Sequence, residues 1–316
     1  MRKKIISVAV VTYNSSATVL ETLDSIMFQT YGSKNIDLVI SDDASIDGTI
    51  DLIEKWVDIN GSKFNSIEVI ITPQNRGVSA NCNVAWKAIE TEWIKTIAGD
   101  DILLPDCLSE FESFVSKNDN VDICFCELQP FDKSGSEYRT FPFEYYKVNY
   151  ELPQRQQFVR FLSSKGFIHA PGSFIKTSLL KEVNYADENY RNMEDLPLWF
   201  KILKSGRKIY LLEKVLVNYR LGDSVSRVEN KLFNINHIDE SERFYKEVIY
   251  PELNKISVIY RIREELNFKM KRAVVLLGNK KGLISNIILT LSSVMYPRTF
   301  LIAGYLKIKR MLLTIN

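Results

Sequence analysis

The sequence predicts an α/β protein with a doubly wound, mostly parallel sheet, flanking helices and a helical C-terminal extension. Four apolar runs have the composition of strands buried on both faces. Segments with apolar residues at helical spacing lie between these runs. This alternation is typical of parallel strands joined by right-handed crossovers. The four runs span residues 5–11, 36–40, 67–71 and 94–98.

The intervening helices are predicted from their apolar faces. Val19 and Leu23 lie on one face of a helix after the first strand, and Ile50 and Ile53 begin the apolar face of the next. A third helix is expected over residues 79–89, directly after a glycine turn.

The second half of the sheet is predicted from strands over residues 121–127, 170–175 and 208–217. The aromatic-rich segment 131–157 between them is expected to be irregular. A helix begins near Asn192. Its apolar face consists of Leu196, Trp199, Phe200 and Leu203.

Composition and charge describe a globular chain with a distinct tail. Of its 316 residues, 46% are hydrophobic and 25% are charged, which allows one large domain with an appendage. The net charge of +2 is unevenly placed, because residues 266–316 contain nine basic residues and no acidic residue. The preceding residues therefore carry a net charge of −7. A basic tail on an acidic body indicates an anionic partner.

Cysteine and histidine usage excludes several kinds of site. The four cysteines lack the spacing of a zinc site or a disulfide framework, and a reducing cytoplasm is the expected compartment. The first strand follows the N-terminus directly, so no signal peptide is expected. Only two histidines occur, which disfavours a Ser-His-Asp relay. Acid–base chemistry is therefore expected to rest on carboxylates.

Polar clusters follow four predicted strands and should share the carboxyl rim of the sheet, where ligands bind in open α/β folds. Asp100 and Asp101 predict a Mg²⁺ or Mn²⁺ site that also holds a substrate's phosphates. The alternative is that Asp101 caps the following helix. Neither a dinucleotide fingerprint nor a Walker loop is present. The clusters are Thr12-Tyr13-Asn14, Asp42-Asp43, Asn75-Arg76-Gly77 and Gly99-Asp100-Asp101.

Over residues 5–227 the chain resembles the inverting glycosyltransferases of family 2, which have the GT-A fold. The resemblance implies a catalytic domain over 1–227, with a nucleotide half over 1–127 and an acceptor half over 128–227. A helical, basic, membrane-associated region over 228–316 is then expected. Four signatures carry the resemblance: Val10-Val11-Thr12-Tyr13-Asn14, Ser41-Asp42-Asp43-Ala44-Ser45-Ile46-Asp47-Gly48-Thr49, Gly99-Asp100-Asp101, and Glu194-Asp195 with Leu198-Trp199.

The resemblance implies a role for each rim residue. Asp43 would accept a hydrogen bond from a uracil N–H, which a carboxylate can do; the alternative is a cap or turn residue. Asp100 would meet the ribose or a metal-bound water, and Asp101 would ligate the metal. Arg220 would contact the diphosphate. The remaining residues that the resemblance places near the nucleotide are Thr12, Tyr13, Asn14, Asn75, Gly77 and Asn83.

Asp195 matches the general base of the family, and Glu194 precedes it in the same motif. Inversion needs one displacement, during which a carboxylate takes the proton of the acceptor hydroxyl. The metal offsets the charge that develops on the leaving diphosphate. The alternative for Asp195 is a helix N-cap.

The sequence departs from the family pattern at two places. Cys82 stands where relatives often have arginine. No histidine follows Tyr219-Arg220, so a histidine ligand to the metal is not expected.

The tail contains a charge-free run over residues 282–297. We expect helices that lie in the membrane surface with their basic groups on anionic headgroups. One alternative is a helical extension that packs on the catalytic domain or forms a homodimer. The other is a single membrane span that contains Arg298, which is costly.

The expected reaction transfers a sugar from a UDP-sugar, with glucose, galactose or an N-acetyl form, to a lipid-diphosphate-linked saccharide. The resemblance places it in the synthesis of a surface polysaccharide such as an O-antigen or capsule. The basic, apolar tail places it at the cytoplasmic face of the inner membrane. Nucleic acid is not expected as a partner. The alternatives are a catalytically silent, nucleotide-binding membrane scaffold, a sugar-nucleotide pyrophosphorylase and a receiver domain.

Overall fold

The computed structural model describes residues 3–132, 134–138, 140, 144–163, 170–222, 231–253 and 258–294. The chain forms two compact units, Met1–Gly222 and Asp223–Asn316. The predicted boundary between residues 227 and 228 lies outside the described residues, as does the tail beyond residue 294.

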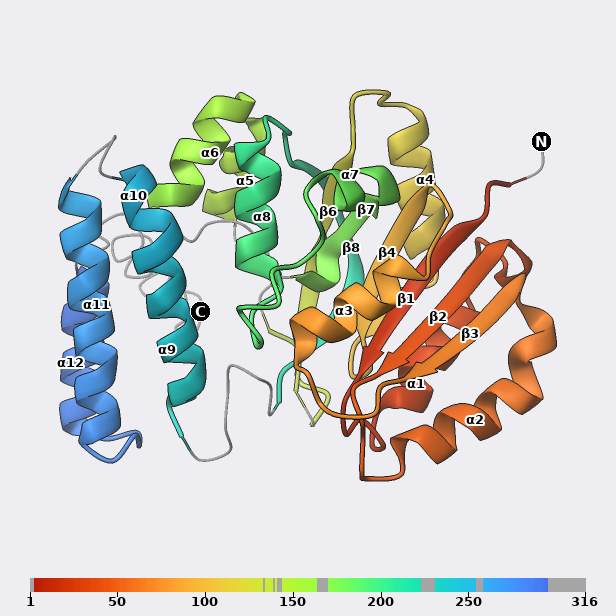
Figure 1. The fold of residues 1–316 in the computed structure, drawn as a ribbon, viewed down its shortest axis with the longest axis horizontal. Coiled ribbons are helices and arrows are strands. Elements are labelled where there is room, and N and C mark those ends of the chain that lie inside the picture. Colours follow the sequence, from red (N-terminus) through yellow and green to blue (C-terminus); the bar gives the residue numbers. More distant parts are fainter. Residues whose placement is uncertain are drawn as a thin grey trace, which may run out of the picture. The chain divides into compact units, whose positions relative to one another are not determined.

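The first unit contains an eight-stranded mixed sheet with the order β3-β2-β1-β4-β7-β6-β8-β5 (Figure 1). The predicted parallel arrangement of the first four strands is confirmed, because β1 pairs in parallel with β2 and β4, and β2 with β3. The strands are β1 (Ile6–Thr12), β2 (Ile36–Asp42), β3 (Ser66–Ile71), β4 (Trp93–Ala98), β5 (Ile102–Leu103), β6 (Ile123–Phe131), β7 (Ser173–Lys176) and β8 (Tyr210–Arg220).

Strand direction departs from the parallel pattern in the second half. β7 runs antiparallel to both β4 and β6, and β5 runs antiparallel to β8, whereas β6 and β8 are parallel. The expected division between residues 127 and 128 falls inside β6. The two halves therefore share one continuous sheet.

Eight α-helices of the first unit are described, and they cover both faces of the sheet (Figure 1). α1, α2 and α4 share one core with the inward residues of β1, such as Val8 and Val10. α3 contacts β1 and β2. The helices are α1 (Val19–Met27), α2 (Thr49–Asn60), α3 (Val78–Lys87), α4 (Cys107–Ser116), α5 (Glu144–Glu151), α6 (Gln154–Ser163), α7 (Thr177–Glu182) and α8 (Asp195–Lys204).

The expectation that residues 131–157 are irregular is wrong for part of that segment. α5 and the start of α6 lie within it. Tyr150 and Phe161 are buried, and the Gln157 amide donates to the carbonyl oxygens of Tyr150 and Ile209. These tertiary contacts stabilise the two helices, because most of the stability of a short helix in a protein comes from packing rather than from intrinsic propensity.

The second unit is helical, as predicted. Its described residues form α9 (Ile235–Phe244), a π-helical turn (Tyr245–Ile249), α10 (Tyr250–Leu253), α11 (Val258–Leu276) and α12 (Leu283–Val294). The ring of Tyr245 packs edge-on against Phe244, Tyr250 and Phe268, which form its small core. Among the described residues, none of the helices combines the length and the apolar character that crossing a membrane requires.

Candidate active site

The predicted rim exists, because loops after β1, β2 and β4 are joined by hydrogen bonds. The Asp43 amide donates to the Thr12 carbonyl at 3.0 Å, and the Gly99 amide donates to the Val11 carbonyl at 2.9 Å. Gly99 has no room for a side chain, since a Cβ there would lie 2.7 Å from Cγ2 of Thr12. Close packing thus brings the loop that begins at Thr12 and the loop that begins at Gly99 together.

Hydrogen bonds attach the Thr12-Tyr13-Asn14 loop to the segment 42–46 that follows β2. The Thr12 hydroxyl donates to Asp42 at 2.7 Å, and the Asn14 side-chain oxygen accepts from the Ile46 amide at 3.0 Å. The side chains of Thr12 and Asn14 are therefore engaged within the protein. Tyr13 is different: its side chain is half exposed on the rim.

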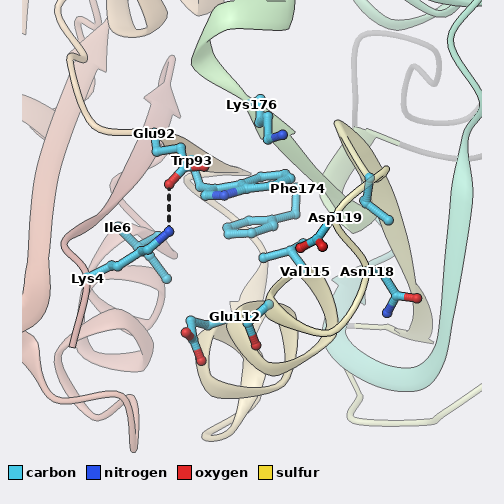
Figure 2. A pocket seen from close by; sticks show the side chains of 12 residues that line it. Lys4, Ile6, Glu92, Trp93, Glu112, Val115, Asn118, Asp119, Phe174 and Lys176 are labelled. Carbon is cyan, nitrogen blue, oxygen red and sulfur yellow. Dashed lines mark hydrogen bonds and ion pairs between the residues drawn. The ribbon is translucent and has the colours of Figure 1, made fainter. Parts of the chain in front are cut away.

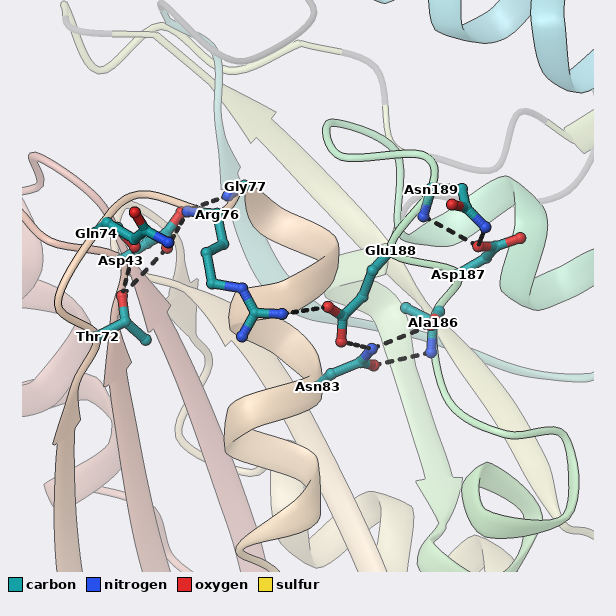
Figure 3. A network of polar contacts seen from close by, with 10 residues as sticks. All are labelled: Asp43, Thr72, Gln74, Arg76, Gly77, Asn83, Ala186, Asp187, Glu188 and Asn189. Carbon is teal, nitrogen blue, oxygen red and sulfur yellow. Dashed lines mark hydrogen bonds and ion pairs between the residues drawn. The ribbon is translucent and has the colours of Figure 1, made fainter.

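Asp43 is buried at the end of β2 and binds the turn before α3 (Figure 3). Its Oδ1 accepts from the Arg76 amide at 2.8 Å, and its Oδ2 accepts from the Gly77 amide at 2.7 Å. The Thr72 hydroxyl donates to Oδ1 at 3.3 Å. The carboxylate of Asp43 thus fixes the Asn75–Gly77 region, which the sequence also assigned to the site.

The segment before α8 is attached to α3 and to the turn that precedes it. The Asn83 amide group exchanges hydrogen bonds with the backbone of Ala186, at 3.0 and 2.9 Å, and donates to Glu188 at 2.9 Å (Figure 3). Arg76 forms a 2.6 Å ion pair with Glu188. The sequence placed Asn83 near the nucleotide, but its side chain forms hydrogen bonds with Ala186 and Glu188 in the segment before α8.

Asp101 is the most unusual carboxylate at the rim. It is 1% exposed, its Oδ1 accepts from the Arg220 amide at 2.9 Å, and its Oδ2 is buried with no hydrogen-bond partner. The Arg220 guanidinium donates to the Asp100 carbonyl at 2.7 Å, pairs with Glu21 and lies 4.6 Å above the Phe131 ring.

Burial disfavours negative charge on both Asp100 and Asp101. Burial raises the pKa of Asp101 well above its ordinary value, and the Asp100 charge raises it further. Burial also raises the pKa of Asp100, against the opposing effect of Arg220. Lys95 is wholly buried in β4 and lowers the pKa of Asp101, but its ammonium donates to the carbonyls of Thr96 and Pro171.

Asp100 and Asp101 fit a hard divalent cation, because such ions bind carboxylate oxygens and Asp101 offers an unpartnered one. Within the described ranges no cluster of three or more His, Cys, Asp or Glu side chains forms a complete metal site. Mg²⁺ in particular commonly takes its remaining ligands from water and substrate phosphates.

Glu194 and Asp195 stand at the start of α8, where the sequence placed a helix start. Burial, and then the charge of Asp195, raises the pKa of Glu194 to about 8. The same two carboxylates raise the pKa of the Cys82 thiol, which burial raises most. Cys82 of α3 therefore faces the start of α8 as a neutral, buried group.

Two cavities lie away from this rim. One, of about 250 Å³, is at the opposite ends of β1 and β4, beside Lys4 and the stacked rings of Trp93 and Phe174 (Figure 2). The other, of about 420 Å³, is lined by Asn83, Lys201 and the turn that includes Tyr185. Neither contains the predicted carboxylates.

Sequence reasoning missed several residues that organise the rim. Arg191 and Glu188 lie in a polar stretch with no motif, so nothing in their spacing indicated their contacts. Lys95 did carry a signal, because it interrupts the apolar run 94–98.

The first unit matches a known protein family. The family model described as glycosyl transferase family 2 matches residues 7–183. An uncharacterized glycosyltransferase of Rickettsia typhi is 26% identical over 222 residues, which cover 70% of this chain and 65% of that protein.

Two solved structures share the fold. Staphylococcus aureus TarS 1–349 in complex with UDP-GlcNAc has a TM-score of 0.55 at 18% identity, covering 84% of this chain and 81% of that one. The mannosyltransferase PcManGT from Pyrobaculum calidifontis, in complex with GDP-Man and Mn²⁺, has a TM-score of 0.57 at 16% identity, covering 97% and 87%. These matches confirm the predicted GT-A architecture.

The family model, which matches more than half of the chain, identifies a glycosyltransferase domain over residues 7–183. The chain belongs to glycosyl transferase family 2, for which an inverting mechanism is typical.

Proposed function

We propose that this chain transfers a sugar from a UDP-sugar to a lipid-diphosphate-linked saccharide, with a divalent metal and by single displacement. The observation that carries the proposal is the buried, unpartnered Oδ2 of Asp101 beside Asp100, on the rim that also carries Asp43. A metal–diphosphate is the ligand that such a pair of carboxylates recognises best.

The uridine would lie between Tyr13 and Asp43. Tyr13 is exposed on the rim, where its ring can stack on a base. A carboxylate has about four acceptor positions, and Asp43 uses three of them for Arg76, Gly77 and Thr72. One position remains for a uracil N–H. Thr12 and Asn14 would act by shaping the loop that presents Tyr13.

Mn²⁺ or Mg²⁺ would be held by Asp101 and, directly or through water, by Asp100. When bound, the ion supplies charge that stabilises the leaving diphosphate. Arg220 lies against Asp100 and supplies a second positive group to the same phosphates. Its pair with exposed Glu21 is weak enough in water for the guanidinium to exchange partners.

Asp195 would take the proton from the acceptor hydroxyl as that oxygen attacks the anomeric carbon. Glu194, whose pKa is about 8, is protonated at neutral pH. It therefore adds no second negative charge next to Asp195. The bond to the UDP oxygen breaks as the new glycosidic bond forms on the opposite face of the sugar.

The acceptor class is proposed from the second unit. Exposed aliphatic side chains recur at helical spacing on α12, and no acidic residue follows Glu265. Such a surface suits the anionic cytoplasmic face of the inner membrane, where lipid-linked saccharides of an O-antigen or capsule pathway are available. The α12 residues are Leu283, Ile284, Ile287 and Leu291.

The test is nucleotide release over a panel of UDP-hexoses, UDP-N-acetylhexosamines and GDP-mannose, with lipid-diphosphate saccharide acceptors, with and without EDTA. We expect acceptor-dependent UDP release that EDTA abolishes and Mn²⁺ or Mg²⁺ restores. Absence of turnover with every donor would contradict the proposal. Turnover with GDP-mannose alone would retain the enzyme class and reject the assignment of uridine.

A further inference from the structure

Arg191 connects the turn on the nucleotide side of the rim with the segment that leads into α8. Its Nη2 donates to the carbonyl oxygen of Asn75 at 2.8 Å and also to the side-chain oxygen of Asn75. Its aliphatic part lies against Gly77, where a Cβ would approach Cγ of Arg191 to 2.1 Å. This side chain is exposed to solvent, so these contacts do not serve to neutralise a buried charge.

The same turn is held from its other side by Asp43. That carboxylate accepts from the Arg76 and Gly77 amides at 2.8 and 2.7 Å. The turn therefore lies between a carboxylate assigned to the uracil and a guanidinium four residues before Asp195. A displacement on one side must be transmitted to the other, because Gly77 packs directly on the backbone of Arg191.

Main-chain contacts continue this attachment toward α8. The Ser79 amide donates to the Arg191 carbonyl at 3.3 Å, and the Ser79 hydroxyl donates to the Tyr190 carbonyl. Farther along α3, Asn83 holds Ala186 and Glu188 (Figure 3). The segment before Asp195 thus rests on α3 over most of its length.

We propose that Arg191 is a positioning residue, which fixes the Asp195 segment on the turn that borders the nucleotide. The inference rests on the proposed function, since it assigns the base to Asp195 and the donor to the rim. As a consequence, the turn that borders the donor and the segment that carries Asp195 are fixed relative to each other. A displacement of about 1 Å between a substrate and a catalytic group can lower the rate roughly 10²-fold.

The first test compares Arg191→Met, which keeps the aliphatic packing on Gly77 but removes the hydrogen bonds to Asn75, with Arg207→Met. Arg207 is an arginine with a 40% exposed side chain that pairs with Asp122 and Glu182 elsewhere in the same unit. For Arg191→Met we expect kcat to fall about tenfold or more and the donor KM to change less than about threefold. Arg207→Met should leave both values near those of the unmodified protein.

A double-variant cycle separates this contact from a general loss of stability. Asn75→Ala removes one of the two acceptors of Arg191, so adding it to Arg191→Met should lower kcat no further. Asn75 is also expected near the nucleotide, and loss of such a contact would raise the donor KM in both backgrounds rather than lower kcat. Multiplicative losses would overturn the proposal. So would an unchanged kcat, or a fall in kcat matched by an equal loss of folded protein.

Hydrogen exchange tests the contact without any donor. In Arg191→Met, amides of residues 186–196 should exchange faster than in the unmodified protein, whereas Arg207→Met should not change them. If the unmodified chain turns over no sugar nucleotide, the proposed function fails while this measurement still decides the attachment. Unchanged exchange at 186–196 would overturn the inference.

Discussion

The backbone amide of Arg220 donates a 2.9 Å hydrogen bond to Oδ1 of Asp101, across 119 residues of sequence. This bond satisfies one oxygen of a buried carboxylate and leaves the other, Oδ2, without a partner. It also fixes the direction in which the side chain can approach a cation. The end of β8 therefore completes a site whose carboxylates come from the end of β4.

Asp101→Asn tests the metal assignment. An amide has nearly the same shape as the carboxylate but lacks its charge, so we expect Mn²⁺ affinity in the presence of UDP to fall by at least roughly tenfold. Transfer should fall by about 10²-fold. Calorimetric titration with Mn²⁺ and UDP measures the first effect. Asp106→Asn, which changes an exposed carboxylate at the start of α4, is the matched control; equal metal affinity in both variants would refute the assignment.

Asp195→Asn separates catalysis from nucleotide binding. Loss of the base should lower kcat by roughly 10²- to 10⁴-fold and leave the Kd for UDP unchanged. Asp187→Asn, in the segment before α8, should retain transfer. If Asp195→Asn retained full transfer, Asp195 would not be the base. If neither variant nor the unmodified chain transferred sugar but all bound UDP, the silent scaffold would be the better description.

Glu194→Gln tests the electrostatics next to Asp195. The pKa of Glu194 is raised from 4.5 to about 8, so the folded chain holds this proton more tightly than the unfolded chain. The resulting stability is complete below the unfolded value and is lost as pH rises through about 8. The Tm of Glu194→Gln should therefore exceed that of the unmodified protein at about pH 9 and converge with it at about pH 5. A constant difference across that range would rule out the raised pKa.

Gly77→Ala tests the close packing between the turn and Arg191. Gly77 and Gly206 both have φ of +90°, but a Cβ at Gly77 would lie 2.1 Å from Arg191 Cγ, whereas a Cβ at Gly206 meets nothing within 4 Å. Gly206→Ala should cost about 1–2 kcal/mol from backbone strain alone. Gly77→Ala should cost at least about 2 kcal/mol more, because of the overlap and because Gly77, with ψ of 165°, lies in a backbone region that is essentially restricted to glycine. Urea denaturation measures both; similar costs would show that the turn can move away from Arg191.

The double substitution Ile284→Ser and Ile287→Ser tests the proposed membrane surface. These side chains are 60% and 51% exposed, so their loss should leave folding unchanged. Burial of two such groups in lipid is worth roughly 3 kcal/mol, so binding to anionic vesicles should weaken about 10²-fold in cosedimentation. Ile59→Ser, which changes an isoleucine 74% exposed on α2, should bind like the unmodified protein. Equal vesicle binding by the double variant, Ile59→Ser and the unmodified protein would show that α12 is not the membrane-binding surface.

The sequence by itself determined the parallel half of the sheet, its rim and the helical nature of the C-terminal unit. Those features follow from local periodicity and from glycines such as Gly99, where the backbone approach of neighbouring loops excludes a side chain. Local patterns are sufficient there because each parallel crossover places its loops at the same edge.

Only the tertiary structure decided the antiparallel direction of β7, the pairing of Arg220 with the carboxylate turn and the attachment of Arg191 to Asn75. These contacts join residues from 48 positions apart, as for Phe125 and Ser173, to 120 positions apart, as for Asp100 and Arg220, and they leave no periodic trace in the chain. The burial that leaves Asp101 Oδ2 without a partner is likewise a property of packing. Charge, hydrogen bonding and solvent exclusion at a site depend on which distant groups meet there, and residue order alone does not specify that.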